Sequence, residues 1–217
     1  MSTFYVQNFG CRATQADGAE LERRLLAQGL GPVPSSSDAT LVVLNSCTVT
    51  AAADRDVRAA IRRIHRENPQ CRILVTGCYA QRAPHELAAL PGVRWVVGNS
   101  HKHQVAEIVG RERPDFVPLA SLEAAPDIFV GDIFAHTQLL AAPVFEAETG
   151  WEKTRPNLKV QDGCDNRRSF CIIPAVRGAS RSLAREDALA KVRELVAAGY
   201  REVVLSGINL GRWGRDL

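Results

Sequence analysis

The chain has 217 residues, of which 46% are hydrophobic and 24% charged, and its formal net charge at pH 7 is +3. This composition is typical of a soluble globular protein with one domain and part of a second, and no apolar run approaches the ~20 residues that a membrane-spanning helix needs. The first residues show no signal-peptide pattern, so we expect a cytoplasmic protein with no membrane partner.

The first 110 residues have the pattern of a parallel α/β sheet, in which extended apolar runs lead into helical stretches. Four strands are expected, at residues 4–6, 41–44, 73–75 and 95–97. Helices are expected at residues 19–28 and 54–66, the second with Val57, Ile61 and Ile64 on one core-facing side. We therefore predict that residues 1–110 form a Rossmann-like, parallel-sheet domain.

Residues 111–155 contain four prolines (114, 118, 126 and 143) and several acidic residues, and we interpret them as a linker with some strand content. Beyond it, a strand at 158–161, a loop, a helix at 184–198 and a strand at 202–205 predict one βαβ unit. This unit is too short to close a barrel. We therefore expect residues 156–217 to be the start of a truncated second domain.

Three of the six cysteines directly follow predicted strands, at the end of the sheet where open α/β folds collect ligands: Cys11, Cys47 and Cys78. Cytoplasmic thiols stay reduced, so metal or cluster ligation is favoured over disulfides. Three thiolates can hold a [4Fe–4S] cluster through three of its irons. From spacing alone, zinc and three unrelated buried cysteines stay open as alternatives. Cys71 lies at the opposite end of its strand, and we predict a buried thiol without a ligand role.

The segments around these cysteines are NFGC at residues 8–11, NSCTVT at 45–50 and TGCYAQ at 76–81. In this order they resemble the three signatures of the amino-terminal domain of radical S-adenosylmethionine methylthiotransferases. The resemblance implies that Cys11, Cys47 and Cys78 ligate an auxiliary [4Fe–4S] cluster. Its open iron would handle the sulfur that the enzyme inserts.

Residues 163–174, GCDNRRSFCIIP, resemble the C-x3-C-x2-C loop after the first strand of the radical-SAM partial barrel. Cys164 and Cys171 match the first and third cysteines, and Arg168 stands at the second. In the family, the three thiolates hold a second [4Fe–4S] cluster, which binds S-adenosyl-L-methionine and cleaves it to a 5′-deoxyadenosyl radical. A guanidinium has no lone pair for a metal, so Arg168 predicts that radical chemistry is lost or severely reduced.

The resemblance also implies a role for Ser206 and Gly207, because radical-SAM enzymes use the end of the second strand to contact the cofactor. Glycine and serine also end strands for purely local reasons, so this assignment has a structural alternative. Arginines in the two basic regions could contact tRNA phosphates or form solvated faces; they are Arg55, Arg58, Arg62, Arg63, Arg66, Arg177, Arg181 and Arg185.

The resemblance is greatest to the methylthiotransferases that modify threonylcarbamoyl-adenosine next to the tRNA anticodon. It implies tRNA, S-adenosyl-L-methionine and a sulfur donor as partners. Isopentenyl-adenosine and an aspartate of a ribosomal protein are the alternative targets. Arg168 and the short second domain favour another hypothesis, a catalytically inactive iron–sulfur remnant. A third hypothesis is a metal-free α/β binding domain.

Overall fold

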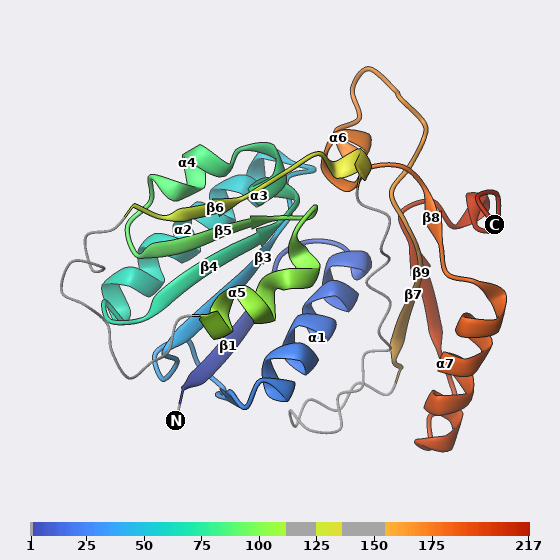
Figure 1. Cartoon of the computed structure of the whole chain (residues 1–217), viewed down its shortest axis with the longest axis horizontal. Helices are drawn as coiled ribbons and strands as arrows, with labels where there is room; N and C mark the ends of the chain where they lie inside the picture. The colour runs from blue at the N-terminus through green and yellow to red at the C-terminus, as the bar shows by residue number, and fades with distance from the viewer. Residues whose placement is uncertain (1, 112–124, 136–154) are drawn as a thin grey trace.

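The computed structural model describes residues 2–111, 125–135 and 155–217. Its main element is a six-stranded sheet in the order β2-β1-β3-β4-β5-β6, in which all neighbouring strands run parallel (Figure 1). The strands are β1 (Thr3–Asn8), β2 (Gly31–Pro32), β3 (Leu41–Ser46), β4 (Arg72–Gly77), β5 (Val93–Gly98) and β6 (Asp127–Phe129). The predicted α/β parallel sheet is confirmed, and the four expected strands correspond to β1, β3, β4 and β5.

Strand β6 comes from the segment that we interpreted as a linker. It pairs with β5, with Trp95 opposite Asp127 and Val97 opposite Phe129. This part of the segment therefore completes the edge of the large sheet. Residues 112–124 and 136–154 of the predicted linker lie outside the described residues.

Helices cover both faces of the large sheet (Figure 1). They are α1 (Arg12–Ala27), α2 (Ala51–Glu67), α3 (Cys78–Arg82), α4 (Pro84–Ala88) and α5 (Val105–Arg111), with the 3₁₀ turn η1 (Lys102–Gln104) before α5. Successive residues of β3 alternate between the two cores. Val42 and Leu44 pack under α2, α3 and α4, whereas Leu41 and Val43 pack under α1 and α5. A central parallel strand that is apolar on both sides fits this double burial.

The sequence located α2 better than α1. Val57, Ile61 and Ile64 are fully buried on α2, as their spacing predicts. Helix α1, in contrast, begins at Arg12, whereas the predicted start was residue 19. The prediction was late because the first turns of α1 bury small and polar side chains and carry no apolar stripe. Among these buried residues is Asp17, which is 1% exposed.

The second part of the chain forms a small mixed sheet in the order β8-β7-β9. Its elements are β7 (Asn157–Asp162), α6 (Ile173–Arg177), β8 (Arg181–Ser182), α7 (Arg185–Ala197), β9 (Val204–Gly207) and η4 (Leu210–Arg212). Strands β7 and β9 are parallel and joined through α7, which is the expected βαβ unit, while β8 adds an antiparallel edge. Leu189 and Val196 of α7 are exposed, and Leu195 is the buried residue of this helix.

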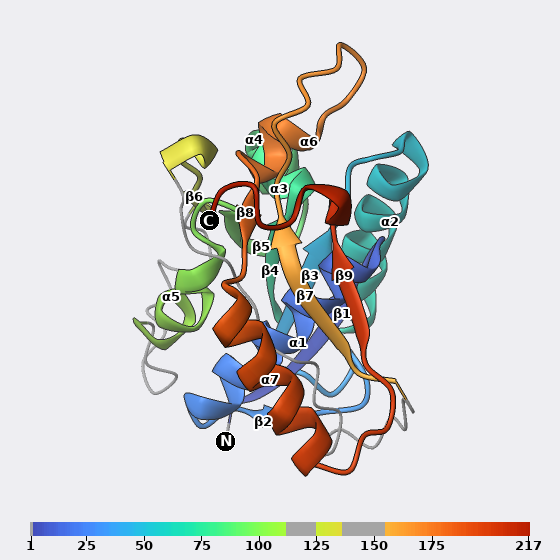
Figure 2. The ribbon, with the colours of Figure 1, turned by 90° about the vertical axis from the view of Figure 1, so that its right-hand side faces the viewer.

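Helix α1 lies between the two sheets, with β1 and β3 on one side and β7 and β9 on the other (Figures 1 and 2). Figure 2 looks onto the small sheet, with α1 and the large sheet behind it. Polar residues at the start of α1 are therefore enclosed from both sides. Across the described ranges, no helix is both long enough and apolar enough to cross a membrane.

Candidate metal centre

Three cysteines lie at the carboxyl end of the large sheet. Cys11 follows β1 and is the N-cap of α1, Cys47 follows β3, and Cys78 opens α3 directly after β4. Since β1, β3 and β4 are hydrogen-bonded neighbours with matched registers, the loops after them lie side by side. Cys47 and Cys78 are buried and Cys11 is exposed. Cys71, at the opposite end of β4, is a buried residue of the core under α2, as predicted.

Two glycines allow these loops to approach one another closely. Gly10 has a φ of +103°, and a Cβ on it would lie 2.7 Å from the Cβ and 2.9 Å from the Sγ of Cys47. Gly77 has a φ of +100°, and a Cβ there would collide with the backbone of Ser46. Any other residue at either position would strain the backbone and push the cysteine-bearing loops apart.

The electrostatic environments of the thiols differ. Although Cys11 is exposed at the surface, partial desolvation of its thiol would by itself raise the pKa; Arg177 and hydrogen bonds from Thr14 and the backbone lower the pKa below its ordinary value. Burial raises the pKa of Cys47, and the nearby Cys78 and Cys11 raise it further. Cys11 therefore has the greater tendency to be a thiolate in the cofactor-free chain, and the three sulfur atoms influence one another.

The donor set consists of three thiols, which are the usual protein ligands of an iron–sulfur cluster. In the described part of the chain, no three His, Cys, Asp or Glu side chains are placed to hold one metal ion. A zinc site needs such convergence, usually of four ligands. A [4Fe–4S] cube takes one thiolate per iron, so its ligands surround the cluster and need not meet at one point.

Polar side chains from α1, β3 and the loop after β5 lie near the cysteines. Asn99, after β5, donates through Nδ2 to Cys78 Sγ at 3.5 Å and to the carbonyl of Val176 at 2.7 Å. Thr14 Oγ1 lies 3.6 Å from Cys11 Sγ. Asn45, fully buried in the second signature, donates to the Thr14 carbonyl at 2.7 Å. These contacts fix the start of α1 and the thiols relative to the sheet.

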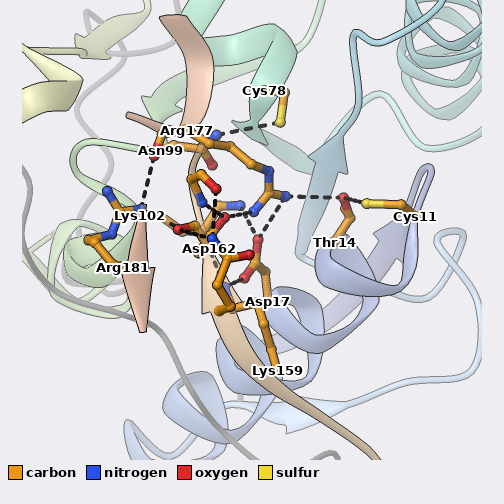
Figure 3. Close-up of polar contacts among 12 residues, drawn as sticks. Cys11, Thr14, Asp17, Cys78, Asn99, Lys102, Lys159, Asp162, Arg177 and Arg181 are labelled. Atoms are coloured by element: carbon orange, nitrogen blue, oxygen red, sulfur yellow. Dashed lines mark hydrogen bonds and ion pairs between the residues drawn. The ribbon is translucent and has the colours of Figure 1, made fainter. Parts of the chain in front are cut away.

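Beside the cysteines lies a buried ion cluster formed by Asp17, Lys102, Lys159, Asp162 and Arg177 (Figure 3). Asp17 accepts from Lys102 Nζ at 3.1 Å and from Arg177 Nη2 at 3.3 Å, and it also contacts Lys159 Nζ. Asp162 accepts from Lys159 at 2.9 Å and from Arg177 Nη1 at 2.8 Å. The ion cluster thereby connects α1 and η1, which lie within residues 2–111, to β7 and α6, which lie within residues 155–217.

Arg177 corrects one of our expectations. We considered it a candidate for tRNA phosphate, but its side chain is 2% exposed and bound to two carboxylates, so it cannot meet a phosphate in this structure. The rest of the ion cluster was not foreseen from the sequence. The available signal was in β7, a fully buried strand that contains the two charged residues Lys159 and Asp162.

The loop after β7 carries the other predicted ligands. Cys164 is buried and Cys171 half-buried, while Arg168, between them, is exposed. The loop is closed by the Cys171 N–H, which donates to the Arg168 carbonyl at 3.0 Å, and by the Cys164 N–H, which donates to the Gly178 carbonyl at 3.1 Å. Asn209 Nδ2 lies 3.8 Å from Cys164 Sγ.

Ser206 and Gly207 lie at the carboxyl end of β9, level with the end of β7. Gly207 pairs with Gln161, and a Cβ on this glycine would lie 2.9 Å from the Cβ of Gln161. Ser206 is 6% exposed, and within the described ranges its hydroxyl has no hydrogen-bond partner. Both residues thus lie at the same end of the small sheet as the cysteine loop.

The arginines of α2 are only in part engaged in ion pairs. Arg58 pairs with Glu86 at 3.0 Å and donates to the Tyr79 hydroxyl at 2.5 Å. Arg55, Arg62 and Arg66 are exposed. The solvated-face interpretation accounts for them as well as a phosphate contact does.

Comparisons with known proteins agree with this architecture. Residues 3–98 match the model of a family described as "Uncharacterized protein family UPF0004". The threonylcarbamoyladenosine tRNA methylthiotransferase MtaB of Aquifex aeolicus is 37% identical over 97% of this chain and 48% of its own length. The tRNA-2-methylthio-N(6)-dimethylallyladenosine synthase of Sphingopyxis alaskensis is 35% identical over 99% of the chain and 46% of its own length.

The ribosomal protein uS12 methylthiotransferase RimO of Chloroflexus aurantiacus is 32% identical over 99% of the chain and 48% of its own length. The chain thus spans about half the length of the curated relatives that it matches. Residues 3–98 thus match the model of the UPF0004 family, and over nearly its full length this chain is similar to the amino-terminal half of proteins named as methylthiotransferases.

Proposed function

We propose that this chain carries the auxiliary-cluster part of a tRNA methylthiotransferase, with a [4Fe–4S] cluster held by Cys11, Cys47 and Cys78. The observation that supports this best is the placement of the three thiols on neighbouring loops at one end of the sheet. Gly10 and Gly77 permit that approach. When bound, such a cluster supplies an iron without a protein ligand, which can take up sulfur for transfer.

We propose that the second part corresponds to the first βαβ unit of a radical-SAM partial barrel. Cys164 and Cys171 would then be the remaining ligands of a second [4Fe–4S] cluster, and Ser206 and Gly207 would adjoin S-adenosyl-L-methionine. With Arg168 in the middle of the loop, only two thiolates are available. Two ligands leave one iron of the usual three without a thiolate, so we expect the radical chemistry of this chain to be lost or severely reduced.

The proposed target is threonylcarbamoyl-adenosine beside the anticodon of tRNA, as in the Aquifex relative's name. The other two relatives named above act, by their names, on dimethylallyladenosine in tRNA and on ribosomal protein uS12. These are the alternative targets. The arginine at position 168 supports a further alternative, in which the chain is an iron–sulfur protein of this family without turnover.

Anaerobic reconstitution with iron and sulfide, followed by iron and sulfide analysis, tests the proposal. We expect about one four-iron cluster per chain, and its loss when Cys11, Cys47 or Cys78 is replaced by alanine. Cys71→Ala is the matched control and should keep the cluster. Two clusters in the unaltered chain would contradict the role given to Arg168. No cluster would favour the metal-free binding domain.

Arg168→Cys tests the second loop. We expect this variant to bind about twice as much iron as the unaltered chain. In a protein that also contains the remainder of the enzyme, it should gain reductive cleavage of S-adenosyl-L-methionine, measured as 5′-deoxyadenosine. Arg167→Cys is a control, because it adds a thiol one position away from the motif. Equal iron uptake by both variants would contradict the proposal that the loop after β7 binds a cluster through thiols at positions 164, 168 and 171.

A further inference from the structure

The buried ion cluster carries more positive than negative charge. It contains the three cations Lys102, Lys159 and Arg177, which are 1–2% exposed, against the two carboxylates Asp17 and Asp162. Arg181, at its margin, lies 4.0 Å from Asp162 and adds no negative charge. A buried charge is expensive without a partner of opposite sign. The excess positive charge of the buried ion cluster therefore favours the presence of an anion next to it.

Cys11 and Cys78 lie on the side of the cluster where Arg177 is found (Figure 3). While Nη1 of Arg177 is bound to Asp162, Nη2 donates to Thr14 Oγ1 at 3.4 Å, and that oxygen is in contact with Cys11 Sγ. On the other flank, Asn99 binds both the carbonyl of Val176 and the sulfur of Cys78. Asn99 therefore holds the end of α6, where Arg177 lies, next to Cys78.

Arg177 stays charged in this environment. Burial by itself lowers the pKa of its guanidinium, but attraction by Asp162, Cys78, Asp17 and Cys11 raises the pKa well above its ordinary value. The two cysteines contribute to this effect alongside the two carboxylates. Arg177 is thus a fixed positive charge that interacts electrostatically with the carboxylates of the ion cluster and with the thiols of Cys11 and Cys78.

We infer that Arg177 is the internal counter-cation of the three-cysteine site, a positioning residue that neutralises an anionic iron–sulfur cluster and makes the cluster easier to reduce. This inference rests on the proposed function, because it needs a [4Fe–4S] cluster on Cys11, Cys47 and Cys78. A cube with three thiolates is anionic, and one-electron reduction adds a further negative charge. A fixed cation beside it favours the reduced form, since net charge and hydrogen bonding set the potentials of such clusters.

The same geometry assigns opposite effects to two residues. Removing the charge of Arg177 takes a cation away from the cluster, so the reduced form loses stability. Replacing Asp162 by asparagine removes the carboxylate that offsets Arg177, so the cluster experiences more positive charge. A purely structural role for Arg177 predicts no such pair of opposite shifts.

The test is a potentiometric titration of the full chain, reconstituted anaerobically and followed by electron paramagnetic resonance and visible absorption. Cys164→Ala and Cys171→Ala are introduced in every sample, so that the signal comes from one cluster. Arg177→Met should reduce the equilibrium constant for one-electron reduction at least tenfold, which is a shift of about 59 mV to lower potential. Arg177→Lys should shift it less, and Asp162→Asn should shift it to higher potential.

Arg24→Met is the matched control. Arg24 is partly buried and bound to Glu20 on the same helix as Thr14, but it lies in the last turn of α1, far from the cysteines. Its removal should leave the potential unchanged. Equal potentials for the Arg177→Met variant and its parent would overturn the inference. If Arg177→Met does not retain a cluster, Asp162→Asn decides, and an unchanged or lower potential in that variant overturns the inference. A parent chain that binds no iron and sulfide overturns the proposed function, and the inference with it.

Discussion

Asp17 offers the sharpest test of how the two parts of the chain are held together. Its carboxylate accepts contacts from Lys102, Lys159 and Arg177, which come from three different elements. Asp17→Asn keeps the shape of the side chain and removes its charge. Three fully buried cations would then have a single carboxylate, Asp162, between them.

The expected cost follows from this count. Removing one partner of a buried ion pair destabilises a protein by about 3–5 kcal/mol, because the other charge is left uncompensated. For a chain of 150–250 residues, each kcal/mol lowers the melting temperature by about 2–4 °C. Asp17→Asn should therefore lower the melting temperature by about 6–20 °C. A loss of about 3–5 kcal/mol is a large part of the free energy of unfolding, which is normally about 5–15 kcal/mol.

Urea unfolding of the cofactor-free chain, followed by circular dichroism, measures the effect on the free energy of unfolding. Asp56→Asn is the control, since Asp56 is an exposed acid on α2 and should change stability by no more than about 0.5 kcal/mol. A loss below about 1 kcal/mol in Asp17→Asn would refute the view that Asp17 neutralises buried cations.

The pH dependence supplies a second measurement of the same variant. Burial raises the pKa of Asp17, but Lys102, Lys159 and Arg177 outweigh it and leave the pKa below its ordinary value. The pKa of Asp162 lies well below its ordinary value, because Arg177 and Lys159 overcome its burial. The stability from a lowered carboxyl pKa is present above the unfolded-state value of about 3.9 and is lost as the pH falls through the folded-state value. Asp17→Asn should therefore lose less stability on acidification than the unaltered chain.

Three further variants test the site and its surroundings. Lys102→Met should destabilise the chain less than Asp17→Asn in the same urea titration, because it removes excess positive charge where the other variant adds to it. Gly10→Ala should lower the iron content after reconstitution, because the new Cβ collides with the cysteine after β3; Gly29→Ala, at a φ of +81° in open space, should keep it. Cys71→Ala should leave the iron content unchanged and cost about 1 kcal/mol of stability, because it removes a small buried side chain from the core.

The sequence predicted the elements whose apolar pattern is set by burial. The strand runs at 41–44 and 73–75 and the stripe on α2 are apolar because both faces of the large sheet are covered. It placed the start of α1 too late. The buried side chains of its first two turns include Thr14 and Asp17, and hydrophobic periodicity does not detect polar residues that are buried with partners.

The candidate metal centre was likewise predictable only where a local sequence pattern marks its residues. Cys11, Cys47 and Cys78 could be located because each follows a recognisable strand. Arg177 and Asp17 are separated by 160 positions in the chain, and their pairing depends on the docking of α6 against α1. No local pattern encodes such a contact, so a solvated or phosphate-binding arginine was the natural interpretation of Arg177.

The positions of Arg168 and Arg177 separate the ligands of the second cysteine loop from the positive charge beside the first three cysteines. Arg168 is exposed in the loop between Cys164 and Cys171 and lies outside the ion cluster, and under the proposed function it stands where a ligand is expected. Arg177 lies just past that loop, where Asp162 binds its guanidinium and Asn99 holds the preceding carbonyl. The loop can therefore lose its own cluster while α6 keeps its place beside Cys11 and Cys78. On this geometry, a chain that lacks the proposed radical chemistry would still have Arg177, the proposed counter-cation, beside Cys11 and Cys78.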